Sequence, residues 1–288
     1  MNYTIKSDNM TYVISSRGAE LISAKDDTGT EFIWQADPEV WGAHAPLSFP
    51  VCGRIKNSRY LHDGKWYEMG IHGFLSSMEF EEVEYTENSL TLTTKSNEKT
   101  RASYPFDFSF KASYITENGK LKCAYFVKND GNLPMPYAFG LHPGFNIFTE
   151  VADYKVIFDR EDFGRRMKVE SGRDSAITPI HLPGGVLDLD EEEIYRIDTI
   201  ILKYPGTTAR LVSDAAHHEV SLEFSEELGF FCIWKAARHE AKYLCLEPWT
   251  ATPTKDDGEE VLKTRHDMIN LAPGESNEYT LNISITKS

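Results

Sequence analysis

The sequence of 288 residues lacks any stretch approaching the ~20 apolar residues that a membrane-spanning helix needs. Its first residues contain no basic region followed by an apolar core, so no secretory signal is predicted. Basic residues are scarce: 30 Lys and Arg stand against 45 Asp and Glu, a formal net charge of −15. Polyanions are bound by clustered Lys and Arg, so we expect neither nucleic acid nor a membrane surface as partner.

Cysteine is rare, and the four thiols lie far apart in apolar surroundings, at Cys52, Cys123, Cys232 and Cys245. No Cys-x-x-Cys pair is present, which argues against a disulfide framework and against a cysteine zinc site. We therefore expect four reduced, buried thiols in a cytoplasmic protein.

Motifs of several enzyme classes are missing. We find no Gly-x-Gly-x-x-Gly, no phosphate-binding loop and no Gly-x-Ser-x-Gly, so no cofactor is predicted. His218-Glu219 and His239-Glu240 both lack the second histidine of a His-Glu-x-x-His zinc motif. The spacing of potential ligands therefore predicts no metal.

Two-residue periodicity dominates what is present. Apolar and polar side chains alternate on both sides of Asn118-Gly119, and this dipeptide suits the positive φ angles of a tight turn. The pattern predicts a long β-hairpin over residues 106–128. A second hairpin is predicted at Asp63-Gly64, joining Ser58–Leu61 to Lys65–Met69.

Many more short segments read as strands, and few as helices. A helical turn is predicted at Asp37–Trp41 and another short piece within Asp188–Arg196. No repeat or long linker divides the chain. We predict one all-β domain over residues 1–288, a sandwich or a barrel. The other predicted strands are Thr11–Ser15, Glu31–Trp34, Ser89–Thr94, Thr199–Lys203, Ala209–Ser213, Val220–Phe224, Phe230–Trp234, Tyr243–Leu246 and Glu278–Ile285.

Glu247 is the strongest functional candidate on local grounds. It ends an apolar strand and is followed by Pro248-Trp249, which predicts partial desolvation of its carboxyl group. Desolvation raises a carboxyl pKa and makes the ionised form a stronger base. The structural alternative is an ion pair with a Lys or Arg elsewhere in the chain.

His142 also ends an apolar strand, and Pro143-Gly144 then turns the chain away. This arrangement would present an imidazole at the rim of a sheet, although a core histidine bonded to the backbone explains the pattern equally well. Three further polar residues stand beside glycine or at a strand end. They are Arg54, His72 and Asp198, and each also fits a structural role as an ion pair, a bonded histidine or a strand cap.

Together and in this order, four segments resemble the motifs of the aldose 1-epimerase (galactose mutarotase-like) family. They are Val51-Cys-Gly-Arg-Ile55, His72-Gly-Phe74, His142-Pro-Gly-Phe-Asn-Ile147 and Leu244-Cys-Leu-Glu247. Gly53 replaces the usual Asn, one glycine is missing after His72, and Pro248-Trp249 replaces Thr-Gln. The pattern looks closer to the LacX-like branch of the family.

The resemblance implies a large antiparallel β-sandwich with few short helices, which binds one small sugar. It implies that Glu247 and His142 are catalytic. From the proton transfers that anomer exchange requires, we hypothesise that Glu247 is the base and that His142, protonated in the resting complex, is the acid. Arg54, His72 and, least securely, Asp198 would bind sugar hydroxyls. No cofactor or metal is implied.

The interpretation predicts a mutarotase, and three alternatives stay open. A glycoside hydrolase would need two carboxyl groups about 5–9.5 Å apart, for which Glu247 and Asp198 are candidates. A hexose-6-phosphate epimerase would need added basic residues, such as Arg59, Arg101 or Arg238. A non-catalytic sugar-binding protein would keep the aromatic side chains without accelerating the exchange of α and β anomers that a mutarotase catalyses.

Overall fold

The computed structural model describes residues 1–7, 9–168, 174–189, 199–203, 206–236, 240–253 and 261–287. Within these ranges, antiparallel strands dominate and the predicted all-β sandwich is confirmed. The largest sheet has nine strands. In spatial order they are β17 (Val186–Asp188), β14 (Lys155–Phe158), β19 (Thr208–Ser213), β20 (His218–Phe224), β24 (Ser276–Lys287), β10 (Lys120–Asn129), β9 (Phe108–Glu117), β8 (Ser89–Lys95) and β7 (Glu81–Tyr85).

A second sheet of eight strands carries two of the four motif segments, those that contain His142 and Glu247. Its order is β16 (Asp174–His181), β15 (Asp162–Lys168), β18 (Thr199–Lys203), β21 (Phe230–Trp234), β22 (Tyr243–Trp249), β12 (Gly140–Leu141) and β4 (Leu47–Ser48), and β13 (Gly144–Asn146) also pairs with β22. Smaller sheets are formed by β1 (Asn2–Lys6), β2 (Met10–Ser15) and β3 (Leu21–Asp26), by β5 (Arg59–His62) and β6 (Lys65–Glu68), and by β11 (Met135–Tyr137) and β23 (Ile269–Leu271).

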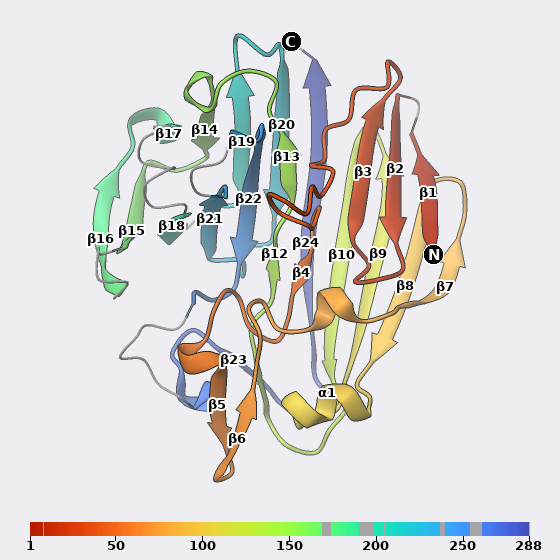
Figure 1. Ribbon diagram of the computed structural model, residues 1–288, viewed down its shortest axis with the longest axis vertical. Coiled ribbons are helices and arrows are strands. Elements are labelled where there is room, and N and C mark those ends of the chain that lie inside the picture. Colours follow the sequence, from red (N-terminus) through yellow and green to blue (C-terminus); the bar gives the residue numbers. More distant parts are fainter. Residues whose placement is uncertain are drawn as a thin grey trace.

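The eight-stranded sheet and the β1–β3 sheet both pack on the nine-stranded sheet (Figure 1). Phe231 of β21 contacts Phe158 of β14 and Phe224 of β20, with ring centroids 5.3 and 5.6 Å apart. On the other side, the hydroxyl of Tyr114 in β9 donates to the backbone carbonyl of Ala19, between β2 and β3. Strands such as β9 and β10 alternate buried and more exposed residues, so the nine-stranded sheet presents an apolar face to this shared core.

Both predicted hairpins are present. Asn118 and Gly119 connect β9 to β10 with φ angles of 51° and 74°, and Asp63 and Gly64 connect β5 to β6 with 46° and 76°. Positive φ at both central residues is the requirement that Asn-Gly and Asp-Gly meet most easily. All the other predicted strands except Glu31–Trp34 are confirmed, with small shifts at their ends.

The prediction of a strand over Glu31–Trp34 is wrong, because only isolated bridges form there. The carboxylate of Glu31 accepts hydrogen bonds from the amides of Ala24 and Ile33 at 2.8 and 3.0 Å. A side chain therefore takes the place of a ladder partner for these amides.

Helices are short, as expected. One turn forms at Asp37–Trp41, where the Trp41 amide donates to the Asp37 carbonyl at 2.8 Å. The sequence analysis missed α1 (Glu98–Ser103), which Asn97 caps by accepting from the amides of Lys99 and Thr100. Of the helical piece predicted within Asp188–Arg196, residues 190–196 lie outside the described residues. Single 3-10 turns occur at η1 (Lys56–Ser58), η2 (Leu75–Ser77), η3 (Val151–Asp153), η4 (Pro183–Gly185) and η5 (Leu262–Thr264).

Two expectations from composition can be compared with the structure. All four cysteines are buried thiols outside any disulfide bond, as predicted. In the part of the chain that the structure describes, no helix has the length and apolar character needed to cross a membrane.

Candidate active site

Glu247 lies in the middle of the eight-stranded sheet, on the face of β22 that points away from the core. Residues 243–249 are all buried, and Leu244 and Leu246 belong to the hydrophobic core. Because successive side chains of a strand point to opposite faces, Tyr243, Cys245 and Glu247 share the other face. The Glu247 side chain is fully buried, although it carries an ionisable group.

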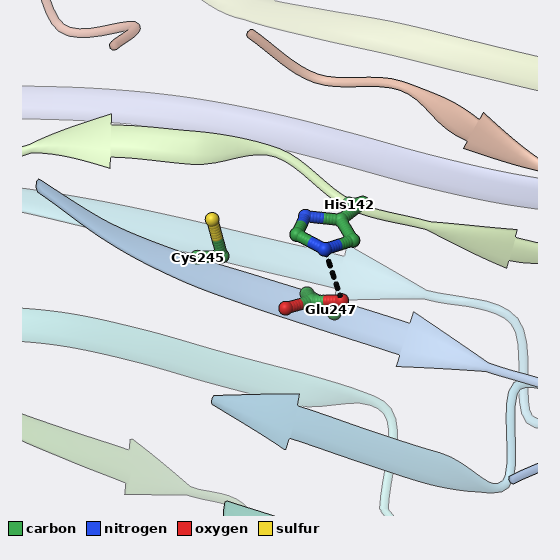
Figure 2. A group of neighbouring side chains, drawn as sticks. All are labelled: His142, Cys245 and Glu247. Carbon is green, nitrogen blue, oxygen red and sulfur yellow. Dashed lines mark ion pairs between the residues drawn. The ribbon is translucent and has the colours of Figure 1, made fainter. Parts of the chain in front are cut away.

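His142 faces Glu247 because two short strands pair with β22 on either side of it. Gly140 of β12 pairs with Trp249, and Gly144 of β13 pairs with Cys245, so the connection between them crosses beside Glu247. The Nε2 atom of His142 lies 3.1 Å from Oε2 of Glu247 (Figure 2). The structure thus brings together the two residues that the motifs indicate.

Burial decides the protonation of this pair. It raises the pKa of Glu247 well above the usual carboxyl value, and the Cys232 thiol opposite in β21 offsets the shift only in part. Burial also lowers the pKa of His142 well below its usual value, and the nearby His72 lowers it further. Both shifts favour the neutral pair over the ion pair, because a charge is costly without water. This opposes the protonated resting imidazole expected from the sequence.

His72 lies beside this pair, in a tight backbone turn. Its ring is 5.0 Å from that of His142, nearly edge-on at 81°. The Gly53 amide donates to its Nδ1 at 3.1 Å, and the Ser48 hydroxyl lies 2.9 Å from the same atom. Burial lowers the pKa of His72 to about 4, and the charge of Arg54 adds to this shift. A neutral His72 whose Nδ1 accepts must carry its proton on Nε2, which is therefore a donor.

Arg54 is exposed, and its charge reaches His72, so the two lie at one rim of the site. The glycine before it has a steric reason: a Cβ at Gly53 would lie 2.4 Å from Cγ of Pro253. Its φ of 67° also favours glycine. Asp198, the fifth predicted residue, lies outside the described residues.

An aromatic wall covers the imidazole, formed by Trp34, Trp41, Trp234 and Tyr243. Trp41 stacks on His142 with centroids 5.0 Å apart, and Trp234 meets the imidazole edge-on at 5.6 Å. Tyr243 stacks on both Trp41 and Trp34, at 5.6 and 4.5 Å. Trp249 also meets the rings of His142 and His72, at 6.5 and 5.7 Å, so four of the five tryptophans, all except Trp66, lie around the site.

Cys245 is the residue of this site that sequence reasoning missed. Its position two residues before Glu247 in a strand was the available signal, since i and i+2 share a face. Its Sγ and the ligand atoms of His142 and Glu247 all lie within 4.8 Å of one another. Burial raises the pKa of the Cys245 thiol, Glu247 raises it further, and the buried ammonium of Lys235 lowers it.

Comparisons with known proteins agree with the motif pattern. A family model described as aldose 1-epimerase matches residues 1–284. Among curated proteins, the chain is 26% identical over 308 residues to the chromosomal LacX protein of Lactococcus lactis subsp. lactis, covering 99% of both chains.

Solved structures give the same result. The chain is 31% identical to a galactose mutarotase related enzyme from Lactobacillus acidophilus, with a TM-score of 0.92 and coverage of 100% and 98%. It is 25% identical to a galactose mutarotase-like protein from Lactobacillus casei ATCC 334, with a TM-score of 0.91 and coverage of 99% and 100%. The sequence resemblance, including its LacX-like character, is confirmed.

Proposed function

Because the chain belongs to the aldose 1-epimerase family, we propose that it interconverts the α and β anomers of a hexose. The reaction opens the cyclic hemiacetal and closes it on the other face of C1. A base takes the proton of the C1 hydroxyl, an acid protonates the ring oxygen, and the bond between C1 and that oxygen breaks as the carbonyl forms. After rotation about C1–C2, the same steps run in reverse.

The observation that carries this proposal is the 3.1 Å contact between Nε2 of His142 and Oε2 of Glu247. The two oxygens that exchange protons in mutarotation are bonded to the same carbon atom. One base and one acid lying next to each other can therefore reach both oxygens, the base taking the proton of the C1 hydroxyl and the acid protonating the ring oxygen. A pair placed on opposite sides of the sugar ring is not required.

In this proposal, Glu247 is the base and His142 is the acid. The pair works with a single proton, which in the substrate-free site resides on the carboxyl group because burial favours the neutral pair. Sugar hydroxyl groups replace part of the missing solvation and make the charged form accessible, with the proton on Nε2. Each group could contribute about 10²–10⁴-fold as a positioned acid or base.

The remaining predicted residues would orient the sugar. His72 offers an Nε2–H donor beside the catalytic pair, and Arg54 offers a charged guanidinium group with several N–H donors at the rim of the site. Asp198 would bind a further hydroxyl group. Trp41 and Trp234 would shield the reacting atoms from bulk water.

The same contact favours a mutarotase over a glycoside hydrolase. Hydrolysis needs two carboxyl groups about 5–9.5 Å apart, one of them acting as nucleophile or activating water. Within the described residues, the ionisable groups in contact with Glu247 are the imidazole of His142 and the thiol of Cys232, not a second carboxyl group. An imidazole and a carboxyl group suit a two-way proton transfer.

The proposal is tested by measuring anomer exchange with NMR across free and phosphorylated aldohexoses. We expect exchange above the spontaneous rate for at least one sugar of the panel. Absence of acceleration for every sugar would contradict the proposal and leave a binding protein. Release of reducing sugar from a disaccharide would point to hydrolysis.

A further inference from the structure

Three side chains with different metal-binding atoms meet on the face of β22 that points away from the hydrophobic core. The imidazole of His142, the thiol of Cys245 and the carboxyl group of Glu247 place their ligand atoms within 4.8 Å of one another (Figure 2). All three side chains are buried. Cys245 has no part in the proton transfers proposed above, so its presence in this cluster calls for a separate explanation.

The polar atoms of this cluster are poorly satisfied by the protein. Among the residues that the structure describes, Nδ1 of His142 and both carboxylate oxygens of Glu247 lack an amide or hydroxyl partner. Buried polar groups usually have such partners, because a buried polar atom without a hydrogen bond destabilises the fold. Each side chain is held by strand pairing, through β22 itself or through β12 and β13 on either side of His142. The backbone positions of the three residues are therefore fixed, while the partners of the Glu247 carboxyl group are the imidazole of His142 and the thiol of Cys232.

The spacing suits a small tetrahedral ion. Zinc binds nitrogen and oxygen at about 2.0–2.2 Å and sulfur at about 2.3 Å, which places neighbouring ligand atoms roughly 3.3–3.6 Å apart. The separation of Nε2 and Oε2 is 3.1 Å, and the thiol must approach by a small side-chain movement. Magnesium and calcium prefer all-oxygen sites, so the thiol and imidazole favour zinc or cadmium.

The charges also match. A thiolate and a carboxylate together neutralise a divalent cation, while the imidazole binds as a neutral ligand. Binding would release two protons to solvent, one from the Cys245 thiol and one from the His142–Glu247 pair. The product is a neutral cluster, which a buried site accommodates better than an isolated charge.

We propose that His142, Cys245 and Glu247 bind one thiophilic divalent cation of the zinc class, and that this ion inhibits the enzyme. The ion occupies the nitrogen and oxygen atoms that would exchange protons with the sugar. Binding itself does not depend on the proposed function, whereas inhibition rests on it. Sugar and ion would therefore compete for the same side chains.

The test uses metal-free full-length protein titrated with Cd²⁺, followed by the ultraviolet charge-transfer band of a cadmium–thiolate bond, and with Zn²⁺ by calorimetry. We expect one ion per chain. Cys245→Ala should abolish the band. Loss of a residue that only hydrogen-bonds to a metal ligand weakens metal binding by roughly 10–100-fold, so loss of the ligand itself should weaken it by at least as much. The matched control is Cys123→Ala, which removes another buried free thiol, on β10. It should bind as the unmodified protein does.

Unchanged cadmium binding in Cys245→Ala, or no binding by the unmodified protein, would overturn the site. Melting curves of both alanine variants show whether a loss of binding reflects unfolding, and Glu247→Gln gives a second variant at the cluster. Inhibition by Zn²⁺ is measured against each variant's own metal-free rate, and Cys245→Ala should resist it. If no sugar is turned over, the binding arm alone decides the metal site.

Discussion

Trp41 lies over the imidazole of His142, with ring centroids 5.0 Å apart and the planes inclined by 29°. Two hydrogen bonds fix the tryptophan in place. Its amide donates to the Asp37 carbonyl, and its own carbonyl accepts from Nε1 of Trp34, both at 2.8 Å. The ring that keeps water from His142 is thus anchored to a turn outside the large sheets, so its effect can be tested separately from the fold.

Replacing Trp41 with alanine should expose His142 and raise the pKa of its imidazole toward the ordinary value, because burial is the main cause of its depression. An NMR titration of the imidazole Cε1 proton measures this shift. Loss of the stacked ring should also cost about 0.5–1.5 kcal/mol of stability beyond the lost burial. Trp66→Ala, on the exposed β5–β6 hairpin, is the control and should leave the titration unchanged. An unaltered His142 titration in Trp41→Ala would contradict burial by this ring.

Glu247→Gln and His142→Asn should each lower kcat by about 10²–10⁴-fold without unfolding the protein. Because the two groups act as one proton-transferring unit, the double variant should be little worse than either single variant. Polarimetry on the best sugar of the NMR panel measures this. His181→Asn, at an exposed histidine 2.9 Å from Asp162, is a matched control and should keep full activity. Near-normal turnover in either active-site variant would remove the assignment.

The pH dependence of kcat/KM should be a broad bell, because the pair must hold one proton. A second proton inactivates it only below the depressed pKa of His142, and loss of the proton occurs only above the raised pKa of Glu247. Burial pushes these limits apart, so the plateau should include neutral pH. In Trp41→Ala the bell should become narrower, because less burial raises the pKa of His142 and lowers that of Glu247. The acid limb should move to higher pH and the alkaline limb to lower pH. A profile with a single limb, or one that widens in the variant, would argue against a one-proton pair.

The sequence was enough to predict about half of the described strands and two of the central side chains, for local reasons, whereas strands such as β1, β3 and β14 were not predicted. Two-residue alternation and the Asn-Gly and Asp-Gly turns define β5, β6, β9 and β10, since register and turn type are set by neighbours in the chain. The apolar run before Glu247 indicated a desolvated carboxyl group, and the structure buries it fully, inside β22 rather than at the end of a strand as expected.

The rest depends on contacts between distant segments. Nothing near Trp41 in the sequence indicates that its ring covers an imidazole 101 positions later, because that contact is set by the backbone hydrogen bonds that join Trp34 and His44 to Gly144 of β13. The location of the resting proton likewise depends on how completely both groups are buried. That burial arises from several elements at once, which the sequence analysis did not place in space.

Gly144→Ala should damage the site through Trp41. A Cβ at this position would lie 2.6 Å from the indole Cζ3 and 3.2 Å from the His44 carbonyl oxygen, closer than packed atoms allow. We expect a loss of about 1–3 kcal/mol in the free energy of unfolding from this overpacking, and reduced activity as the ring shifts. Gly229→Ala is the control, since its Cβ would meet no atom within 4 Å. Urea denaturation measures the free energy of unfolding, and polarimetry measures the activity. If Gly144→Ala changed neither, the aromatic wall would tolerate displacement of Trp41.

The turn that follows β22 is held by a buried pair, Arg265 and Asp267, whose side chains are 7% and 4% exposed. The Arg265 guanidinium donates to the Thr252 carbonyl at 2.7 Å, and Asp267 accepts from the Thr252 amide at 3.1 Å. Removing either partner breaks this buried charge pair and the hydrogen bonds that it makes to Thr252. Arg265→Ala or Asp267→Ala should therefore cost about 3–5 kcal/mol in unfolding free energy.

The pH dependence of this effect has a definite sign. Burial alone would raise the pKa of Asp267, but the charge and hydrogen bonds of Arg265 hold it below the usual value. A carboxyl group with a depressed pKa stabilises the fold at and above its unfolded pKa, and that contribution is lost as the pH falls through the folded value. Urea melts across this range should show the difference between Asp267→Ala and the unmodified protein shrinking in acid. The exposed pair Arg101–Asp107 is the control: Asp107→Ala should cost only about 0–1 kcal/mol. An equal cost at both pairs would mean that burial does not set the strength of the Arg265–Asp267 interaction.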